Sequence, residues 1–223
     1  MGRYSQGVKN KGSQKYIQKL INLNAHLINR KIIEAFDLKE NLNIEWVSPL
    51  LNDHYAEYRD KDFLSRLGLD ALREDLRKFW PRGGPQWDAL AMGDDNIFLV
   101  EAKSHISEIR SSSRVKNPAS VKLIEKSLSD TRKFIGSKTK ADWLSYFYQY
   151  TNRLAHLYFL RELNKKKAFM VFIYFLSDSS MNGPETKEEW LGAISRMKEH
   201  LGINENELSP FIRDIFIDVK ELK

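Results

Sequence analysis

Among its 223 residues the chain has no cysteine, and it has no apolar run of the length that crosses a bilayer. The first absence excludes a disulfide scaffold, cysteine-based zinc sites and a thiol nucleophile. A membrane-spanning helix needs about 20 apolar residues, so none is expected. The polar, lysine-bearing start also lacks the hydrophobic segment of a secretory signal. A cytoplasmic protein with no membrane partner fits these absences.

Several common catalytic signatures are also missing. The chain has neither a glycine-rich phosphate loop nor a Gly-x-Ser-x-Gly elbow, which argues against nucleotide-hydrolysis engines and serine hydrolases. Four of the five histidines lack the spacing of zinc ligands such as His-x3-His. They are His26, His54, His156 and His200.

What is present is a stretch in which charged residues interrupt two apolar, strand-like runs, residues 85 to 103 (PQWDALAMGDDNIFLVEAK). The period of two places Glu101 and Lys103 on one face of the second run and apolar residues on the other. Ionised groups are costly to withdraw from water, so charges at these positions need partners.

The turn between the two runs decides how their charges meet. A two- or four-residue loop centred on Asp94 and Asp95 pairs residues whose numbers sum to 189, which sets Asp88 opposite Glu101. Opposed side chains lie roughly 5 Å apart at their Cβ atoms. Two carboxylates that close need positive charge between them, which a divalent metal supplies with help from Lys103. A three-residue loop would instead send Asp88 to the other face.

This arrangement resembles the active-site signature of the PD-(D/E)XK nuclease superfamily, the restriction-endonuclease-like fold. Asp88 matches the first acid of that motif, Glu101 the second acid and Lys103 the lysine. Trp87 departs from the pattern, because it stands where the motif has proline, and Pro85 lies two positions earlier. The competing interpretation is an exposed Glu101–Lys103 salt bridge on a sheet edge.

The resemblance implies a Mg²⁺-dependent phosphodiesterase in which Mn²⁺ substitutes for Mg²⁺. Asp88, Glu101 and the Ala102 carbonyl would hold the metal, and Lys103 would orient or activate the attacking water. DNA is the expected substrate, and an endonuclease is favoured over an exonuclease. A homodimer is an open alternative, because cutting both strands commonly needs two active sites.

Many members of the family carry a further acid on a helix before the hairpin, where it completes a metal shell. Two residues compete for this role, Glu57 and Glu74. Glu57 has aromatic neighbours that would bury it and is the preferred catalytic residue, whereas Glu74 lies among charges typical of a solvated helix face. Either acid alone is equally compatible with an ordinary solvated position.

Three further residues are candidates for nucleic-acid contacts. Gln149 and Arg153 fall four residues apart on one face of an expected helix, where they contact phosphate or steady the metal shell if they are functional. An ordinary exposed face is the alternative. Exonuclease-type relatives place Gln-x-x-x-Tyr there, and Arg153 departs from that pattern. His105 lies two residues beyond Lys103, where it touches substrate or caps the next helix.

The pattern of elements predicts an α/β fold with a mixed sheet and flanking helices, a restriction-endonuclease-like core with an N-terminal helical extension. Residues 1–54 are assigned to a basic arm and helical extension, and 55–223 to the nuclease core, within a single compact domain. Residues 1–13 are expected to be mobile. Helices are predicted over residues 13–36, 55–67, 69–79, 119–135, 141–163 and 188–201, and strands over 86–92, 96–103, 168–176 and 211–219. Residues 43–51 stay ambiguous.

The formal net charge of +6 is concentrated in two places. Residues 1–19 hold five Lys or Arg and no acid, and residues 103–140 hold ten Lys or Arg against three acids. Such excess is the electrostatic footprint of a polyanion-binding surface, although it also aids solubility. Two other function classes stay open: a noncatalytic nucleic-acid-binding protein that retains the nuclease fold, and an enzyme acting on a small phosphorylated molecule.

Overall fold

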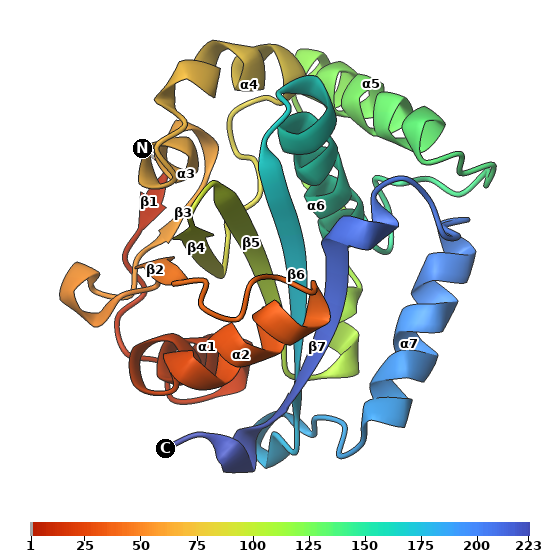
Figure 1. The fold of residues 1–223 in the computed structure, drawn as a ribbon. Helices are drawn as coiled ribbons and strands as arrows, with labels where there is room; N and C mark the ends of the chain where they lie inside the picture. Colours follow the sequence, from red (N-terminus) through yellow and green to blue (C-terminus); the bar gives the residue numbers. More distant parts are fainter. Residues whose placement is uncertain (1) are drawn as a thin grey trace.

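A five-stranded mixed sheet runs through the middle of the protein, seen in a computed structural model that describes residues 2–223 (Figure 1). Its strand order is β2-β4-β5-β6-β7. The bounds are β2 Glu45–Ser48, β4 Ala89–Gly93, β5 Asn96–Lys103, β6 Lys167–Leu176 and β7 Ile212–Asp218. Pairing is antiparallel between β2, β4 and β5 and parallel between β5, β6 and β7. The predicted α/β class with a mixed sheet is therefore confirmed.

The register of the β4–β5 hairpin is the one that the sequence predicts. Ala89 pairs with Val100 and Gly93 with Asn96, so paired residue numbers sum to 189. The two-residue loop requires a positive φ, and Asp94 adopts one of 52°. β4 begins one residue after Asp88, so Asp88 lies just beyond the ladder instead of within it.

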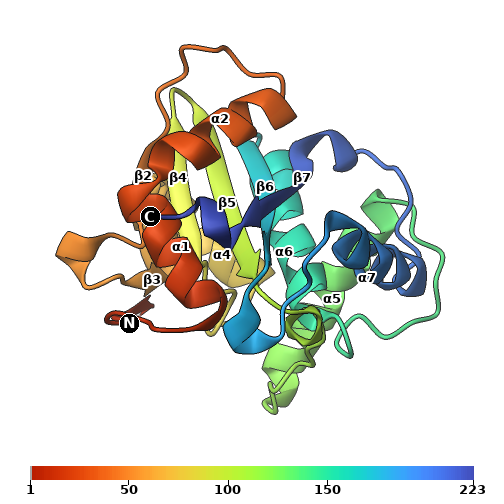
Figure 2. The same ribbon diagram turned by 90° about the horizontal axis from the view of Figure 1, so that it is seen from below.

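Helices cover both faces of the sheet (Figure 2). α1 (Gly12–Leu23) and α2 (Ala25–Ala35) pack with Phe98, Val100 and Ala102 on one face. The other face packs against α4, α5, α6 and α7 (Arg73–Phe79, Pro118–Phe134, Tyr148–Tyr158 and Lys187–His200). Because side chains alternate along a strand, Glu101 and Lys103 point to the face that α6 covers.

The prediction of one helix over residues 13–36 is wrong, because the chain breaks at Asn24 between α1 and α2. Asn24 has φ −131° and ψ 26°, outside the helical region. Its side-chain amide donates to the Lys19 carbonyl at 3.2 Å. An asparagine that bonds to nearby backbone offers the chain an alternative to the helix.

The predicted helix over residues 55–67 is wrong in its first part. α3 spans Asp60–Arg66, and Glu57–Tyr58 forms a short strand, β3, paired with β1 (Arg3–Tyr4). Part of the segment expected to be a mobile arm is thus hydrogen-bonded to β3; residue 1 of that segment lies outside the described residues. Local periodicity carries no signal for a partner more than fifty residues away, which explains the error.

The helix predicted over residues 141–163 begins late, at Tyr148, and its last turn is a π-helix over Phe159–Leu163. The other predicted helices and strands lie within a few residues of their expected bounds. The ambiguous stretch 43–51 contains β2. No helix in residues 2–223 combines the length and apolarity that crossing a membrane requires.

Replacing Phe98 on β5 tests the packing under α1 and α2. Its side chain is fully buried and stacks on Phe169 at 5.4 Å between ring centroids. We expect Phe98→Ala to lower the free energy of unfolding by about 3 kcal/mol or more, measured by urea titration. Val8→Ala, at an exposed position, serves as the control and should change it by less than about 0.5 kcal/mol. Equal effects in the two variants would contradict this packing.

Candidate active site

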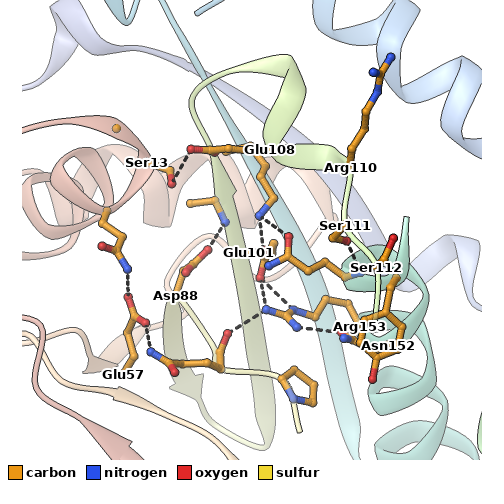
Figure 3. A pocket seen from close by; sticks show the side chains of 18 of the residues that line it. Ser13, Glu57, Asp88, Glu101, Glu108, Arg110, Ser111, Ser112, Asn152 and Arg153 are labelled. Carbon is orange, nitrogen blue, oxygen red and sulfur yellow. Dashed lines mark hydrogen bonds and ion pairs between the residues drawn. The ribbon is translucent and has the colours of Figure 1, made fainter. Parts of the chain in front are cut away.

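A cleft of about 860 Å³ opens over the carboxyl end of β5 (Figure 3). Its floor is formed by Asp88, Glu101, Ala102 and Lys103, the residues that the sequence singles out. The remaining lining comes from the chain around α1, from β3, from the segment before β4, from the loop after β5 and from α6. These residues include Lys11, Ser13, Gln14, Glu57, Gln86, Glu108, Arg110, Ser112, Arg114, Tyr148, Gln149, Asn152 and Arg153.

Asp88 reaches the floor because β4 begins only at Ala89. In a strand, the N–H and C=O of one residue point to the same neighbour, and those of Ala102 face the β4 side. No β4 residue continues the ladder there, so Asp88 Oδ2 accepts the Ala102 N–H at 2.7 Å. Asp88 and the Ala102 carbonyl therefore face the same part of the cleft.

Glu101 is a buried carboxylate held by two cations. It is 2% exposed; Oε1 accepts from Lys103 Nζ, while Oε2 accepts from Arg153 Nε at 2.8 Å and Nη2 at 2.5 Å. Burial alone would raise the pKa of Glu101, but the charges of Arg153 and Lys103 outweigh burial and lower it. Glu101 is therefore ionised at neutral pH.

The Arg153 side chain reaches from α6 to the sheet and is buried, so its guanidinium is bonded to protein groups. Besides Glu101, it donates to the Gln86 carbonyl at 2.8 Å and to Asn152 Oδ1 at 2.8 Å. Its guanidinium lies 5.0 Å from the centroid of the Trp87 ring. These contacts fix Glu101 in place.

Lys103 points along the same face, where its Nζ contacts Glu101 and donates to Gln149 Oε1 at 3.2 Å. Burial alone would lower the pKa of Lys103, but Glu101 and Asp88 outweigh burial and raise it. The residue as a whole is 9% exposed. Lys103 is thus a fixed positive charge at the floor of the cleft.

Glu57 is the third carboxylate at the cleft, on β3 rather than on a helix. Three glutamine amides donate to it, Gln86 at 2.5 Å, Gln6 at 2.9 Å and Gln14 at 3.4 Å. Burial raises the pKa of Glu57 to about 7, against the lowering effect of the hydrogen bonds from Gln86 and Gln6. Burial, with repulsion from Glu101 and Glu57, also raises the pKa of Asp88 well above its usual range.

The floor of the cleft offers oxygen atoms of the kind that a hard divalent cation binds. Such ions prefer carboxylate and carbonyl oxygens. Asp88 Oδ1 has no hydrogen-bond donor within the described chain, and the Ala102 carbonyl faces the same side. Glu101 uses three of its roughly four acceptor positions, which leaves one on Oε1. These oxygens fit Mg²⁺, although residues 2–223 contain no group of three or more His, Cys, Asp or Glu side chains arranged as metal ligands.

Two of the predicted residues lie away from the floor. Glu74, the alternative acid, is on α4 outside the cleft lining and pairs with Arg77 at 2.7 Å on the surface. His105 is also outside the lining, and its Nε2 lies 3.2 Å from Glu108 Oε1. The structure therefore brings Glu57, and not Glu74, to the two motif acids.

The sequence interpretation missed the amides that surround the carboxylates. Gln86 precedes Asp88 by two residues, so the period of two could have placed it on the same side. Asn152 adjoins the predicted Arg153. Gln6 and Gln14 carried no usable signal, because they lie in a polar segment with no periodic pattern before α1.

The wall behind Arg153 is aromatic and contains a buried histidine. His156 is 1% exposed and packs among Phe63, Phe79, Trp80 and Trp87, with its Nδ1 2.8 Å from the Asn152 carbonyl. Burial lowers the pKa of His156 to about 3. His156 is therefore neutral at physiological pH.

Comparison of the chain with protein-family models, with curated proteins and with solved structures found no match. The assignment of a function therefore depends on the geometry of the cleft.

Removing the buried guanidinium tests the network around Glu101. We expect Arg153→Met to lower the free energy of unfolding by about 3 kcal/mol or more, because it leaves Glu101 buried with one cation fewer. Glu101→Gln combined with Arg153→Met should cost less than the sum of the two single variants, measured by urea unfolding of all four proteins. Strictly additive effects would argue against direct coupling.

His156 should make stability depend on pH. Because its pKa falls from about 6.5 unfolded to about 3 folded, the unfolded state binds the extra proton between these values. The stability that neutral His156 contributes is fully present above pH 6.5 and is lost as pH falls toward 3. The loss in the free energy of unfolding between pH 6.5 and 4 is roughly 3 kcal/mol at most. In the His156→Gln variant, urea unfolding should show a smaller loss over this range than wild type; an unchanged slope would rule out this role.

Proposed function

We propose that this protein is a divalent-metal-dependent nuclease that hydrolyses phosphodiester bonds in nucleic acid, with DNA as the expected substrate. The observation that carries the proposal is the meeting of Asp88, Glu101 and Lys103 at the floor of one cleft, on the hairpin register that their spacing requires. The likeness of these residues to the PD-(D/E)XK signature and the basic loop after β5 support it.

In the proposed reaction, Asp88, Glu101 and the Ala102 carbonyl would hold Mg²⁺, and this ion would supply Lewis-acid stabilisation of charge on the phosphate. Arg153 keeps Glu101 oriented through its two hydrogen bonds. Lys103, positioned by Glu101 and Gln149, presents positive charge to the scissile phosphate and orients the attacking water. Glu57 lines the same cleft and accepts hydrogen bonds from three glutamine amides.

A noncatalytic nucleic-acid-binding protein is the second candidate, and one observation favours it. Both oxygens of Glu101 already accept hydrogen bonds from Lys103 and Arg153, so the charge of this carboxylate is neutralised without a metal. Such a protein would keep the basic surface and the fold but would have no reason to bind a metal through Asp88.

Cleavage and metal binding together test the proposed function. We expect Mg²⁺-dependent cleavage of DNA by wild type, and a loss of about 100-fold or more in Lys103→Ala and in Asp88→Asn, because each variant removes a charge that acts at the phosphate or the metal. Calorimetric titration with Mn²⁺ should give binding to wild type and weaker binding to Asp88→Asn.

Lys39→Ala is the matched control, because Lys39 is an exposed lysine outside the cleft lining. It should cut DNA at the wild-type rate. Robust activity that survives Lys103→Ala would remove Lys103 from the mechanism. DNA binding without Mn²⁺ binding or cleavage would favour the noncatalytic protein instead.

A further inference from the structure

The reactive groups lie deep between two walls of the cleft. Glu101 is 2% exposed and Lys103 9%, so a phosphate has to enter the cleft to reach them. Figure 3 shows Ser13 and Glu57 on one side of the floor and Arg110, Ser112 and Asn152 on the other. The walls meet where Ser13 Oγ lies 3.4 Å from Glu108 Oε1.

This shape discriminates between forms of nucleic acid. A base-paired duplex is a stiff rod, with a persistence length of about 150 base pairs, so bending its backbone into a cleft whose walls meet costs free energy. A single strand bends at each nucleotide, so its backbone can enter and its bases can turn toward the walls.

The cleft walls carry amide and aromatic side chains, which are the kinds of side chain that bind unpaired bases. Four amide side chains line the cleft, together with the half-buried ring of Tyr148. They are Gln14, Gln86, Gln149 and Asn152, and each uses one polar atom inside the site, on Glu57, Lys103 or Arg153, which leaves its other polar atom for a base. Aromatic rings stack on bases of any sequence, and amides can bond to base edges that pairing would hide.

Free positive charge lies at the mouth of the cleft. Lys11 on one wall and Arg110 and Arg114 on the other are exposed, and none forms an ion pair within the described chain. Arg110 points away from the carboxylates in Figure 3. The acid on this rim, Glu108, is already engaged by the Ser104 N–H and by His105.

We propose that the cleft accepts single-stranded nucleic acid, with the backbone drawn in by Lys11, Arg110 and Arg114 and a base stacked on Tyr148. This inference deepens the proposed function and rests on it, because the strand is the substrate of that same site.

Binding is measured apart from cleavage, by fluorescence anisotropy of a labelled DNA oligonucleotide in EDTA, as a single strand and as its blunt duplex. The single strand should bind wild type about tenfold more tightly than the duplex, the ratio that one stacked base provides. Tyr148→Ala should lose about tenfold in single-strand affinity, while Tyr148→Phe, which keeps the ring, should retain it.

The charged rim is tested through salt. Arg110→Ala combined with Arg114→Ala should reduce the slope of log affinity against log salt by about 1.4, the value for two lost contacts to a single strand. Arg30→Ala combined with Lys31→Ala removes two charges from α2, outside the cleft lining, and should leave the slope near wild type.

Duplex binding equal to or tighter than single-strand binding would overturn the inference, even if Mg²⁺-dependent cleavage shows the nuclease to be real. If the Arg110/Arg114 variant and the Arg30/Lys31 variant reduced the salt slope equally, the assignment of Arg110 and Arg114 to backbone contacts would also be overturned. Tight single-strand binding that the variants weaken as expected, without cleavage in Mg²⁺, would support the binding mode and overturn the proposed nuclease activity. No binding and no cleavage would overturn both.

Discussion

A carboxylate buried on the central sheet is the constraint that organises this protein. Glu101 lies inside a strand, where an unpaired charge would be costly. Its stabilisation requires Lys103 from the same strand and Arg153 from α6, so sheet and helix are fixed relative to each other by charge as well as by apolar contact. Arg153 in turn needs the Gln86 carbonyl and the Trp87 ring. The segment before β4 is thereby tied to α6.

The start of β4 at Ala89, and not earlier, turns this network into a site. If β4 extended back through Asp88 to Trp87, the Ala102 N–H and C=O would be used in the ladder. The bend at Asp88 instead gives the N–H a carboxylate acceptor and leaves the carbonyl facing the cleft. Burial, with repulsion among the three acids, raises the pKa values of Glu57 and Asp88, while Arg153 and Lys103 keep Glu101 ionised. Such opposed environments are typical of functional sites, and less often occur in purely structural networks.

The hairpin, the buried strand β6 and the shared face of Glu101 and Lys103 could be predicted from sequence, because each follows from a short-range period or from turn length. Features that depend on distant pairing could not. The residues around Glu57 predicted a helix, but pairing with β1 places Glu57 in a strand. The sequence predicted for Arg153 either a contact with phosphate or the metal shell or an exposed face of the helix, and only the packing of α6 on the sheet shows it buried against Glu101. At the break between α1 and α2, the Asn24 side chain bonds to the Lys19 carbonyl and to the Lys223 N–H, and periodicity does not register such contacts.

The pairing of β1 with β3 makes the start of the chain part of the cleft. Gly2 has no room for a side chain, because a Cβ there would lie 2.3 Å from the Arg59 carbonyl oxygen. Its N–H donates to Asp62, and four residues later Gln6 bonds to Glu57. Changes in this segment would therefore act on the cradle of an acid in the cleft, although Gln6 and Glu57 are 51 residues apart in the sequence.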